Sequence, residues 1–365
     1  MDFSRPQPVG PAEGPGGQTC GPRAGLGEGG PAWSGQVDAV VIPAIVHPRA
    51  PRVLNATDIA AYAQAMAALP CPDPMARAPR ANGKIDYARL YLAPPTLHGA
   101  VAAIVSRDTR GPELSDAQRL SHFPATPLVS LSWFHGMDVG MAEPGGWQPF
   151  GAAIMLSGSQ SRPGVSWTPT GGRSGMACFP ADAAQALFGL DLAALHDRFV
   201  PAHAVLNARW QQLLAALAQA GDDAATLAAL EHHLAEPWQA LQAEPSPMVS
   251  LRRLGRHWVE RLAWQAYQWR RTLSPRQVER RILAHSGRSL RQWQSLVRTE
   301  GAFFAARERH AAGQPFDWAG LAQDEGFADQ AHLCRETKRI TGFSPSDFAR
   351  RYIEDESFWL YRIWI

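Results

Sequence analysis

The chain has 365 residues, 45% of them hydrophobic, which is enough for two folded domains and a tail. Its net charge is only +2, but the charge is unevenly distributed. Residues 250–351 hold 19 Lys and Arg against 10 Asp and Glu, a net of +9, whereas the rest of the chain holds 16 against 23, a net of −7. The basic segment indicates a polyanionic partner, with a solvated basic surface as the alternative interpretation.

Cysteine usage and hydropathy exclude several classes of protein. No Cys-x-x-Cys pair occurs and no cysteine lies near a His pair at ligand spacing, so we expect neither a disulfide framework nor a zinc site. No phosphate-binding Gly-rich motif precedes a helix, so no cofactor is expected, and a metal site built from one or two of the scattered histidines is the alternative. No apolar run approaches ~20 residues, so no transmembrane helix or membrane partner is expected. No signal-peptide pattern is seen, and a cytoplasmic location is the expectation.

The first two-thirds of the chain predicts a tail and an α+β domain. Residues 1–35 contain ten Gly and six Pro and are predicted to be disordered. Residues 36–240 are predicted to form the domain, beginning with a short helix at 55–69. Within it, short apolar runs separated by Gly and Pro over 84–180 predict a small β-barrel or sandwich. Residues 181–240 have helical apolar spacing.

The last third of the chain predicts helices joined by tight turns. Residues 241–249 are a candidate linker, residues 250–351 read as an all-α domain, and residues 352–365 form a C-terminal extension. The segment "LRQWQSLVRTEGAFFAARERHAAG" (290–313) carries an apolar stripe and predicts a connector helix of roughly 15–20 residues, about 25–30 Å long.

The basic segment contains an internal repeat. When the sequence is shifted by 55 residues, "SPRQVERRILAHSGRSLRQW" (274–293) aligns without a gap on "DQAHLCRETKRITGFSPSDF" (329–348). Only three positions are identical, but the structural roles match. Ser274 and Asp329 are predicted helix N-caps, and Gly287 and Gly342 are predicted left-handed C-terminal residues.

Each copy predicts a helix-turn-helix whose second helix has a cationic outer face. In the second copy, Ala322 and the turn residue Gly326 precede a helix over about 330–340. Helical projection places Ala331, Arg335 and Lys338 opposite the core side of that helix. In the first copy, a helix over about 275–285 presents Arg276, Glu279 and Arg280. Arginine is the side chain best suited to grip guanine or phosphate through two bonds.

These features resemble a known family. The segment "WAGLAQDEGFADQAHLCRETKRITGFSPSDFARR" (318–351) is similar to the C-terminal signature of AraC/XylS transcription regulators. The resemblance covers 250–351 and implies two helix-turn-helix units joined by a connector helix. It departs at Cys334 and Glu336, where the family more often has Ser or Thr and an aromatic residue, and in the first helix of unit one, "WVERLAWQAYQWRR".

The resemblance also implies which residues read bases. The implied positions, with Gln277 and Lys338 completing the candidate set, are Arg276, Gln277, Glu279, Arg280, Gln330, Ala331, His332, Arg335 and Lys338. Segments within 119–201 are similar to an uncharacterised domain found ahead of this DNA-binding domain in part of the family, which implies sensing or dimerisation. The expected partners are an operator DNA, RNA polymerase, a small-molecule effector and a second copy of the chain.

The predicted function is therefore that of a sequence-specific DNA-binding transcription regulator, either an activator or a repressor, and not an enzyme. The alternative is an enzyme with a β-rich catalytic domain at 84–180 and a basic nucleic-acid-targeting module. A Ser/His/Asp or metal constellation in a barrel cleft would favour that alternative, and "GGRSGM" (171–176) misses the Gly-x-Ser-x-Gly pattern by its last residue. We interpret Trp133, Trp147 and Trp167 as barrel core in preference to a pocket lining.

Overall fold

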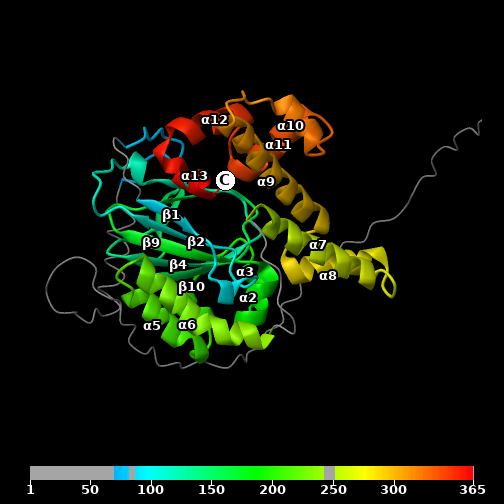
Figure 1. Ribbon diagram of the computed structural model, residues 1–365, viewed down its shortest axis with the longest axis horizontal. Coiled ribbons are helices and arrows are strands. Elements are labelled where there is room, and N and C mark those ends of the chain that lie inside the picture. Colours follow the sequence, from blue (N-terminus) through cyan, green and yellow to red (C-terminus); the bar gives the residue numbers. More distant parts are fainter. Residues whose placement is uncertain (1–69, 82–86, 242–250, 365) are drawn as a thin grey trace, which may run out of the picture. The chain divides into compact units, whose positions relative to one another are not determined.

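The computed structural model describes residues 70–81, 87–241 and 251–364 (Figure 1). The predicted tail at 1–35, the predicted helix at 55–69 and residues 242–249 of the predicted linker lie outside this part. The described residues confirm the predicted fold class, since a strand-rich segment is followed by an all-helical one.

The strands form two antiparallel sheets, which confirms the sandwich-like interpretation of 84–180. The six-stranded sheet has the order β1 (Ala88–Tyr91), β2 (Ala103–Asp108), β9 (Arg173–Phe179), β4 (Val129–His135), β7 (Ile154–Ser157) and β10 (Phe199–Pro201). The four-stranded sheet has the order β3 (Ser121–Phe123), β8 (Gly164–Trp167), β5 (Gly140–Glu143) and β6 (Gly146–Pro149). Strand β10 lies in the segment 181–240, which the sequence pattern predicted as helix alone.

Helices cover one face of the six-stranded sheet (Figure 1). They are α2 (Ala181–Phe188), α3 (Leu192–Leu195), α4 (Ala202–Val205), α5 (Gln211–Gln219) and α6 (Asp223–Leu241), with the 3-10 helices η1 (Pro95–Leu97), η2 (Ala117–Arg119) and η3 (Ala208–Trp210) elsewhere in this segment. The apolar residues that alternate along each strand point toward these helices and are buried, as Leu131 and Trp133 are on β4. Trp133 is thus core, as the sequence analysis predicted.

The opposite face of the same sheet carries small and polar side chains. On β4 the alternate positions are Ser130 and Ser132, and on β9 they are Ser174, Met176 and Cys178. Serine side chains are too short to fill the ~10 Å between two packed sheets. This face therefore does not close into an ordinary core, and the helical segment of the chain reaches over it.

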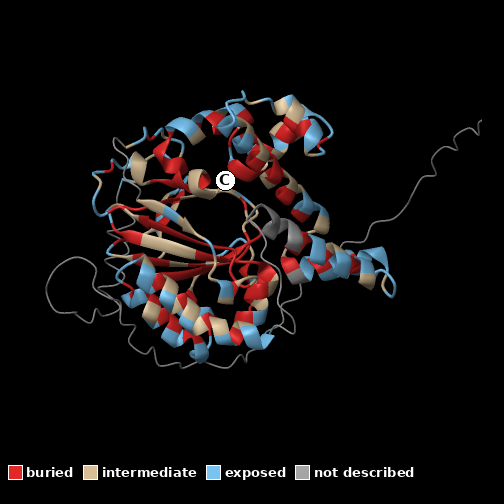
Figure 2. Cartoon of the chain, viewed as in Figure 1, coloured by how far each residue is buried: buried red, intermediate tan, exposed pale blue. Residues whose placement is uncertain are grey.

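The helical segment begins after the linker. It comprises α7 (Leu251–Trp269), α8 (Pro275–Ser286), α9 (Leu290–Ala311), α10 (Trp318–Asp324), α11 (Gln330–Thr341), α12 (Pro345–Glu354), η4 (Glu356–Phe358) and α13 (Trp359–Trp364). Figure 2 shows that buried residues follow the strands and the inner faces of these helices, whereas exposed residues follow the outer surface of α8 and the α10 region.

The C-terminal extension is an integral part of the core. Helix α13 packs on β1 and β3, and Trp359 Nε1 donates a hydrogen bond to Ser121 Oγ at 2.9 Å. The Trp359 ring also faces the guanidinium of Arg107, 4.9 Å from the ring centroid. Arg107 in turn donates to Ser121 Oγ at 3.1 Å and forms a buried ion pair of 3.9 Å with Glu356. These contacts fix residues 356–364 against the sheet.

Both helix-turn-helix units contact the strand-rich segment at the C-terminal ends of α8 and α11. Gly287, which ends α8 with a φ of +76°, lies against the ring of His196 at the end of α3. The carbonyl of Ile340 on α11 accepts a hydrogen bond of 2.9 Å from the backbone of Ala125. The described part of residues 41–365 belongs to one compact unit, and one apolar cluster runs from the sheet through α7, α8 and α9.

We expect Gly287→Ala to destabilise the protein more than Gly326→Ala does. Both glycines have positive φ, which costs a residue with a Cβ about 1 kcal/mol. A Cβ at Gly326 meets open space, whereas a Cβ at Gly287 would lie 2.6 Å from Cγ of His196. Overpacking raises the expected loss at Gly287 to about 3 kcal/mol, measured as the free energy of unfolding in urea.

The matched test of this contact is a double-mutant cycle. Replacing His196 by Ala in the Gly287→Ala background should recover about 1 kcal/mol, because the clashing ring is gone. Equal losses at Gly287 and Gly326, or no recovery in the double variant, would show that α8 does not press on His196.

Candidate nucleic-acid interface

The predicted repeat is present in three dimensions. Helices α8 and α11 both have 12 residues and start 55 positions apart. The Ser274 side chain accepts from the backbone of Gln277 and completes a capping box, and the Asp329 side chain accepts from the backbone of His332. Both helices end at a left-handed glycine, and the next helices are capped by Ser289 and Ser344. These caps confirm the helix boundaries predicted from the sequence.

A further matched pair was missed in the sequence. Ser286 Oγ donates to the carbonyl of Ile282 at 2.8 Å and to that of Arg288 at 3.1 Å. Thr341 Oγ1, 55 residues later, bonds the carbonyls of Thr337 at 2.8 Å and Phe343 at 3.3 Å. Each hydroxyl thus bridges the last turn of its helix to the residue that follows the C-terminal glycine. A small hydroxyl residue directly before each C-terminal glycine was the available signal.

Helix α8, the first candidate recognition helix, turns its cationic side to solvent. Val278 and Ile282 are buried, whereas Arg276, Glu279 and Arg280 are exposed. The fourth candidate residue, Gln277, is exposed but partly engaged, because its Oε1 accepts from the backbone and hydroxyl of Ser274 at 2.9 Å. Its amide N–H groups alone remain to donate outward.

The second recognition helix has the same arrangement. Leu333 and Ile340 are buried, and the outward positions are occupied by Gln330, Ala331, Arg335 and Lys338, all exposed. His332 differs from the other candidates. Its ring is half-buried against Phe327, with a centroid separation of 5.4 Å, and Nδ1 accepts from the backbone of Ala328 at 3.3 Å. In this structure His332 therefore supports the turn between α10 and α11.

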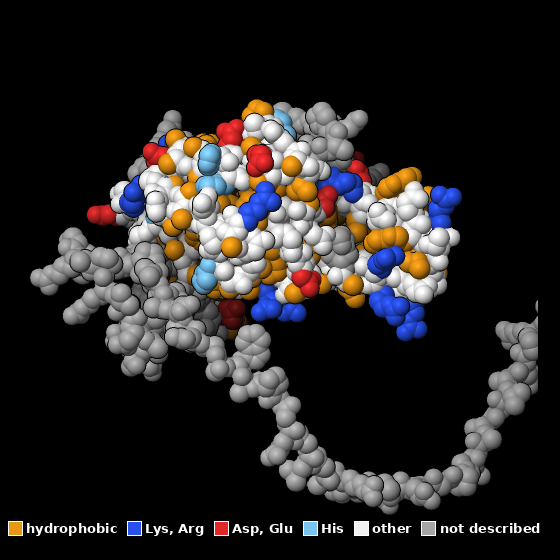
Figure 3. All heavy atoms as spheres, turned by 90° about the horizontal axis from the view of Figure 1, so that it is seen from below, with side chains coloured by type: hydrophobic (Ala, Val, Ile, Leu, Met, Phe, Trp, Pro, Cys, Tyr) orange, Lys and Arg blue, Asp and Glu red, His pale blue; other side chains and the backbone are white. Residues whose placement is uncertain are grey.

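The outward cations are available to a partner. Arg276, Arg280, Arg335 and Lys338 form no ion pair with any side chain that the structure describes. Lys and Arg side chains are seen around the end of the molecule at which α8 lies (Figure 3). An exposed cation without a partner keeps its full charge for a polyanion, and it gives up no ion pair on binding.

One departure from the family pattern has a structural role. Burial raises the pKa of Glu336, but hydrogen bonds from Arg339 and Ser295 outweigh this and leave the pKa below its usual value. Arg339 Nη2 donates to Glu336 at 2.7 Å, and Ser295 on α9 donates to the same carboxylate. Glu336 thus joins α11 to α9 by a charged contact.

Helix α9 connects the two units and is longer than predicted. It has 22 residues, about 33 Å at 1.5 Å per residue, because its apolar stripe continues from Trp293 through Ala306. Trp293 is fully buried, and its Nε1 donates a hydrogen bond of 3.0 Å to Ser286 Oγ of the first unit. The later residues Ala302 and Ala306 pack on Leu321 and Leu333 of the second unit. One continuous helix therefore fixes both units.

The structure contains one Ser/His/Asp group, which bears on the enzyme alternative. Ser159 Oγ lies 2.9 Å from Nδ1 of His196, and Nε2 of His196 lies 3.4 Å from Asp197. Gly287 packs against this imidazole, and none of the three residues lines the cavity over the six-stranded sheet or the pocket beside Thr109 and Gly171. A nucleophile needs room for a substrate beside it, so this group is better explained as a contact that orients His196 toward α8.

Among the described residues, no group of three His, Cys, Asp or Glu side chains is placed to hold a metal ion. None of the described helices is both long enough and apolar enough to span a membrane.

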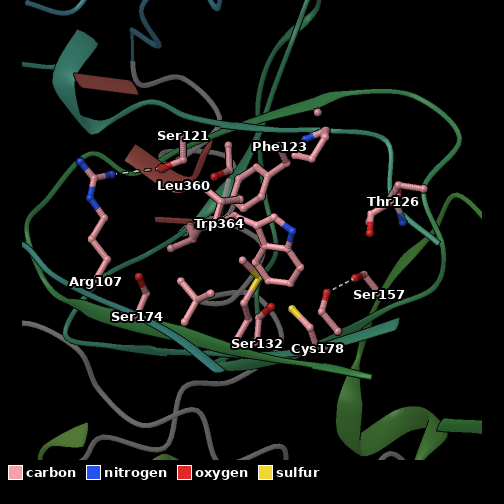
Figure 4. Close-up of a pocket in the computed structure, with 18 of the residues that line it drawn as sticks. Arg107, Ser121, Phe123, Thr126, Ser132, Ser157, Ser174, Cys178, Leu360 and Trp364 are labelled. Carbon is pink, nitrogen blue, oxygen red and sulfur yellow. Dashed lines mark hydrogen bonds between the residues drawn. The ribbon is translucent and has the colours of Figure 1, made fainter. Parts of the chain in front are cut away.

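A cavity of about 180 Å³ lies over the small-residue face of the six-stranded sheet. Figure 4 shows Ser132, Ser174 and Cys178 on the sheet side, with Leu360 and Trp364 of α13 across from them. The remaining wall comes from the four-stranded sheet, where Trp167 contributes, and from Leu296, Glu300 and Phe303 of α9 and Ile340 of α11. The sequence analysis did not predict this cavity, although the repeated serines on β4 and β9 were the available signal.

Glu300 is the acidic side chain in this lining. Burial raises its pKa to about 7, opposed by a hydrogen bond from Trp364. The contact from Trp364 Nε1 is long, at 3.5 Å. The side chain keeps some accessible area although protein surrounds it, because that area borders the cavity.

Comparisons with known proteins found distant structural likenesses. No family model matches the chain, and no curated protein matches it. A crystal structure of ToxT from Vibrio cholerae O395 is 10% identical, covering 63% of this chain and 93% of that one, with a TM-score of 0.30. A 1.65 Å structure of Vibrio cholerae ToxT is 8% identical, covering 72% and 98%, with a TM-score of 0.31. ToxT of strain SCE256 bound to an unsaturated fatty acid is 10% identical, covering 63% and 93%, with a TM-score of 0.30. Likenesses at this level carry no inference about what this chain binds.

We expect Glu300→Gln to stabilise the protein above pH 7. An acid whose folded pKa lies above its unfolded value of about 4.5 contributes full stability below pH 4.5 and loses it as the pH rises to 7. The neutral amide removes this loss, so the variant should gain up to about 3 kcal/mol at pH 8 and little at pH 4.5. Urea denaturation at the two pH values measures the difference.

Glu308→Gln is the control, because Glu308 lies on the same helix with an exposed side chain. A gap between Glu300→Gln and the unmodified protein that stays constant with pH would mean that Glu300 titrates as it does in water.

Proposed function

We propose that the chain is a sequence-specific DNA-binding transcription regulator of the AraC/XylS type. In this proposal α8 and α11 enter successive major grooves of one operator, and the strand-rich segment regulates them in response to an effector or a second copy of the chain. The regulator would act in the cytoplasm on RNA polymerase at neighbouring promoters.

The observation that carries this proposal is the duplicated recognition helix. Two 12-residue helices share their N-caps, their left-handed C-terminal glycines and their hydroxyl residue before that glycine, at a constant offset of 55 positions. A solvated basic surface needs none of these matched ends. Two equivalent helices with outward cations are what repeated contact with a periodic polyanion needs.

The length of α9 agrees with the periodicity of DNA. Major-groove faces on one side of B-DNA repeat every ~34 Å, and α9 extends for about 33 Å. We infer that a connector of this length, which contacts the first unit at Trp293 and the second at Ala302 and Ala306, allows the two helices to reach adjacent grooves. We therefore expect an operator of about 15–20 base pairs that is not palindromic, since one protomer supplies both helices.

The outward residues have complementary reading chemistry. Arg280 and Arg335 can each donate two bonds to guanine O6 and N7, and Glu279 can accept from cytosine N4. Gln277 offers only donors, because its oxygen is used by the capping box. The methyl group of Ala331 suits the thymine C5-methyl. Lys338, in the last turn of α11, is suited to phosphate.

We expect Arg280→Ala and Arg335→Ala to flatten the ranking of operator sequences. Loss of a bidentate base contact removes about 1–3 kcal/mol of discrimination, roughly 5-fold to 150-fold between matched and mismatched sites. Competition binding across an operator with each position varied measures the loss.

Arg307→Ala is the matched control, since Arg307 is an exposed arginine on α9, outside both recognition helices. It should lower affinity for all sequences alike or leave it unchanged. An intact ranking in the Arg335→Ala variant would remove α11 from base reading.

We expect insertion of five base pairs between the two contacted grooves to abolish two-site binding. Half a helical turn moves one groove to the opposite side of the duplex, and α9 cannot follow it without breaking its packing on both units. Footprinting defines the two contacts, and gel shifts measure the affinity. Undiminished affinity after the insertion would show that a single unit reads the DNA.

A further inference from the structure

The size and lining of the cavity over the six-stranded sheet indicate which kind of ligand would fit it. Its lining is mostly apolar, with Met137, Val139, Phe150 and Phe199 among the wall residues, and a row of serine hydroxyls on the sheet side. At about 180 Å³ it is comparable to an engineered cavity of ~150 Å³ that accepts benzene. The matching ligand is a compact apolar molecule of on the order of ten non-hydrogen atoms.

Four charged side chains line the cavity: Arg107, Arg119, Arg162 and Glu300. Two of the arginines are already satisfied. Arg107 donates to Ser121 and to the carbonyl of Gln118, pairs with Glu356 and stacks on Trp359. Arg119 donates to the carbonyls of Leu114 and Thr168 and pairs with Asp116. Arg162 is exposed, so water screens its charge.

Glu300, in contrast to Arg107 and Arg119, has little hydrogen-bond compensation within the protein. Its carboxyl can accept at about four lone-pair positions. Among the described residues, the donor to this carboxyl is Trp364, whose Nε1 lies 3.5 Å from Glu300 Oε1. A buried acidic group with so little compensation is costly for the fold, and the most direct compensation is a cationic donor placed in the cavity.

We propose that this cavity binds a small apolar amine, with the hydrocarbon part against the sheet and the ammonium group paired with the Glu300 carboxylate. Its role as an effector rests on the proposed regulatory function, but the binding itself does not. On the sheet side, the hydroxyls of Ser130 and Ser157 already bond to each other at 2.6 Å where the hydrocarbon part would lie.

The position of Glu300 links the ligand to the DNA-binding units. Glu300 is on α9, which both units pack against, and Ile340 of α11 lines the same cavity. The carbonyl of Ile340 is bonded to Ala125 in the loop after β3. A ligand between these groups contacts the connector and a recognition helix directly, so its affinity must differ between arrangements of the two units that differ at α9 or α11.

The test uses the full chain and three probes of equal chain length: hexylamine, hexanol and hexanoic acid. Hexylamine should raise the melting temperature at pH 7.5 by several degrees with saturating dose dependence, and the other two should give a much smaller shift. Glu300→Gln should weaken hexylamine binding at least 10-fold, while Glu308→Gln should not. Ser132→Leu, which fills the cavity from β4, should remove the response to hexylamine.

Each contrary result overturns a defined part of the proposal. An equal or larger shift with hexanoic acid would assign the cavity to anions and to the arginines. A hexylamine response that survives both Glu300→Gln and Ser132→Leu would place binding elsewhere. Gel shifts separate the two levels: binding of hexylamine at Glu300 with unchanged DNA affinity would overturn the regulatory link. Absence of DNA binding with and without hexylamine would overturn the proposed function and leave the amine site standing.

Discussion

The small-residue face of the six-stranded sheet is the constraint on which the rest of the structure depends. Its strands alternate large apolar residues toward the helices with Ser130, Ser132, Ser174 and Cys178 toward the other side. Such a face buries too little apolar area to hold a second layer by itself. It is covered instead by α13 at the end of the described chain and by α9 and α11 of the helix-turn-helix segment.

Helix α13 shows how such a cover is held. Trp359 stacks on Arg107 and bonds Ser121, and Glu356 pairs with Arg107 from the preceding turn. These polar contacts add to the apolar packing of Trp359 and Leu360 on Val105, and together they fix the helix beside the cavity. Breaking a buried pair of this kind typically costs about 3–5 kcal/mol, far more than an exposed pair. The cavity is therefore a stable feature of the fold, with walls held apart by anchors at their edges.

The predictable parts were those set by local sequence. Ser274, Asp329, Gly287 and Gly342 cap their helices through neighbours within four residues, so the helix boundaries could be read directly. The cavity could not, because it depends on residues 359–364 returning to strands more than two hundred positions earlier. The length of α9 was underestimated for a related reason: Phe303 and Phe304 pack on Phe348 and Phe358, partners invisible to a local pattern. The roles of the exposed arginines remain predictions, because their exposure shows that they are available to a partner and does not show that they contact one.

Helices α8 and α11 are equivalent in their ends but not in their attachments. Arg288 of the first unit occupies the position of Phe343 in the second, and both are buried. Arg288 lies 5.2 Å from the Trp293 ring, and burial, with nearby Arg339, lowers its pKa to about 10. The first unit thus meets the strand-rich segment through a polar contact region that includes His196, whereas the second meets it through Ile340 at the cavity wall. Because both attachments lie at the C-terminal ends of α8 and α11, a change at either would alter the spacing of the helices while leaving their outward residues intact. Under the proposed function, the strand-rich segment would therefore act on the separation of α8 and α11, and not on the chemistry of their outward residues.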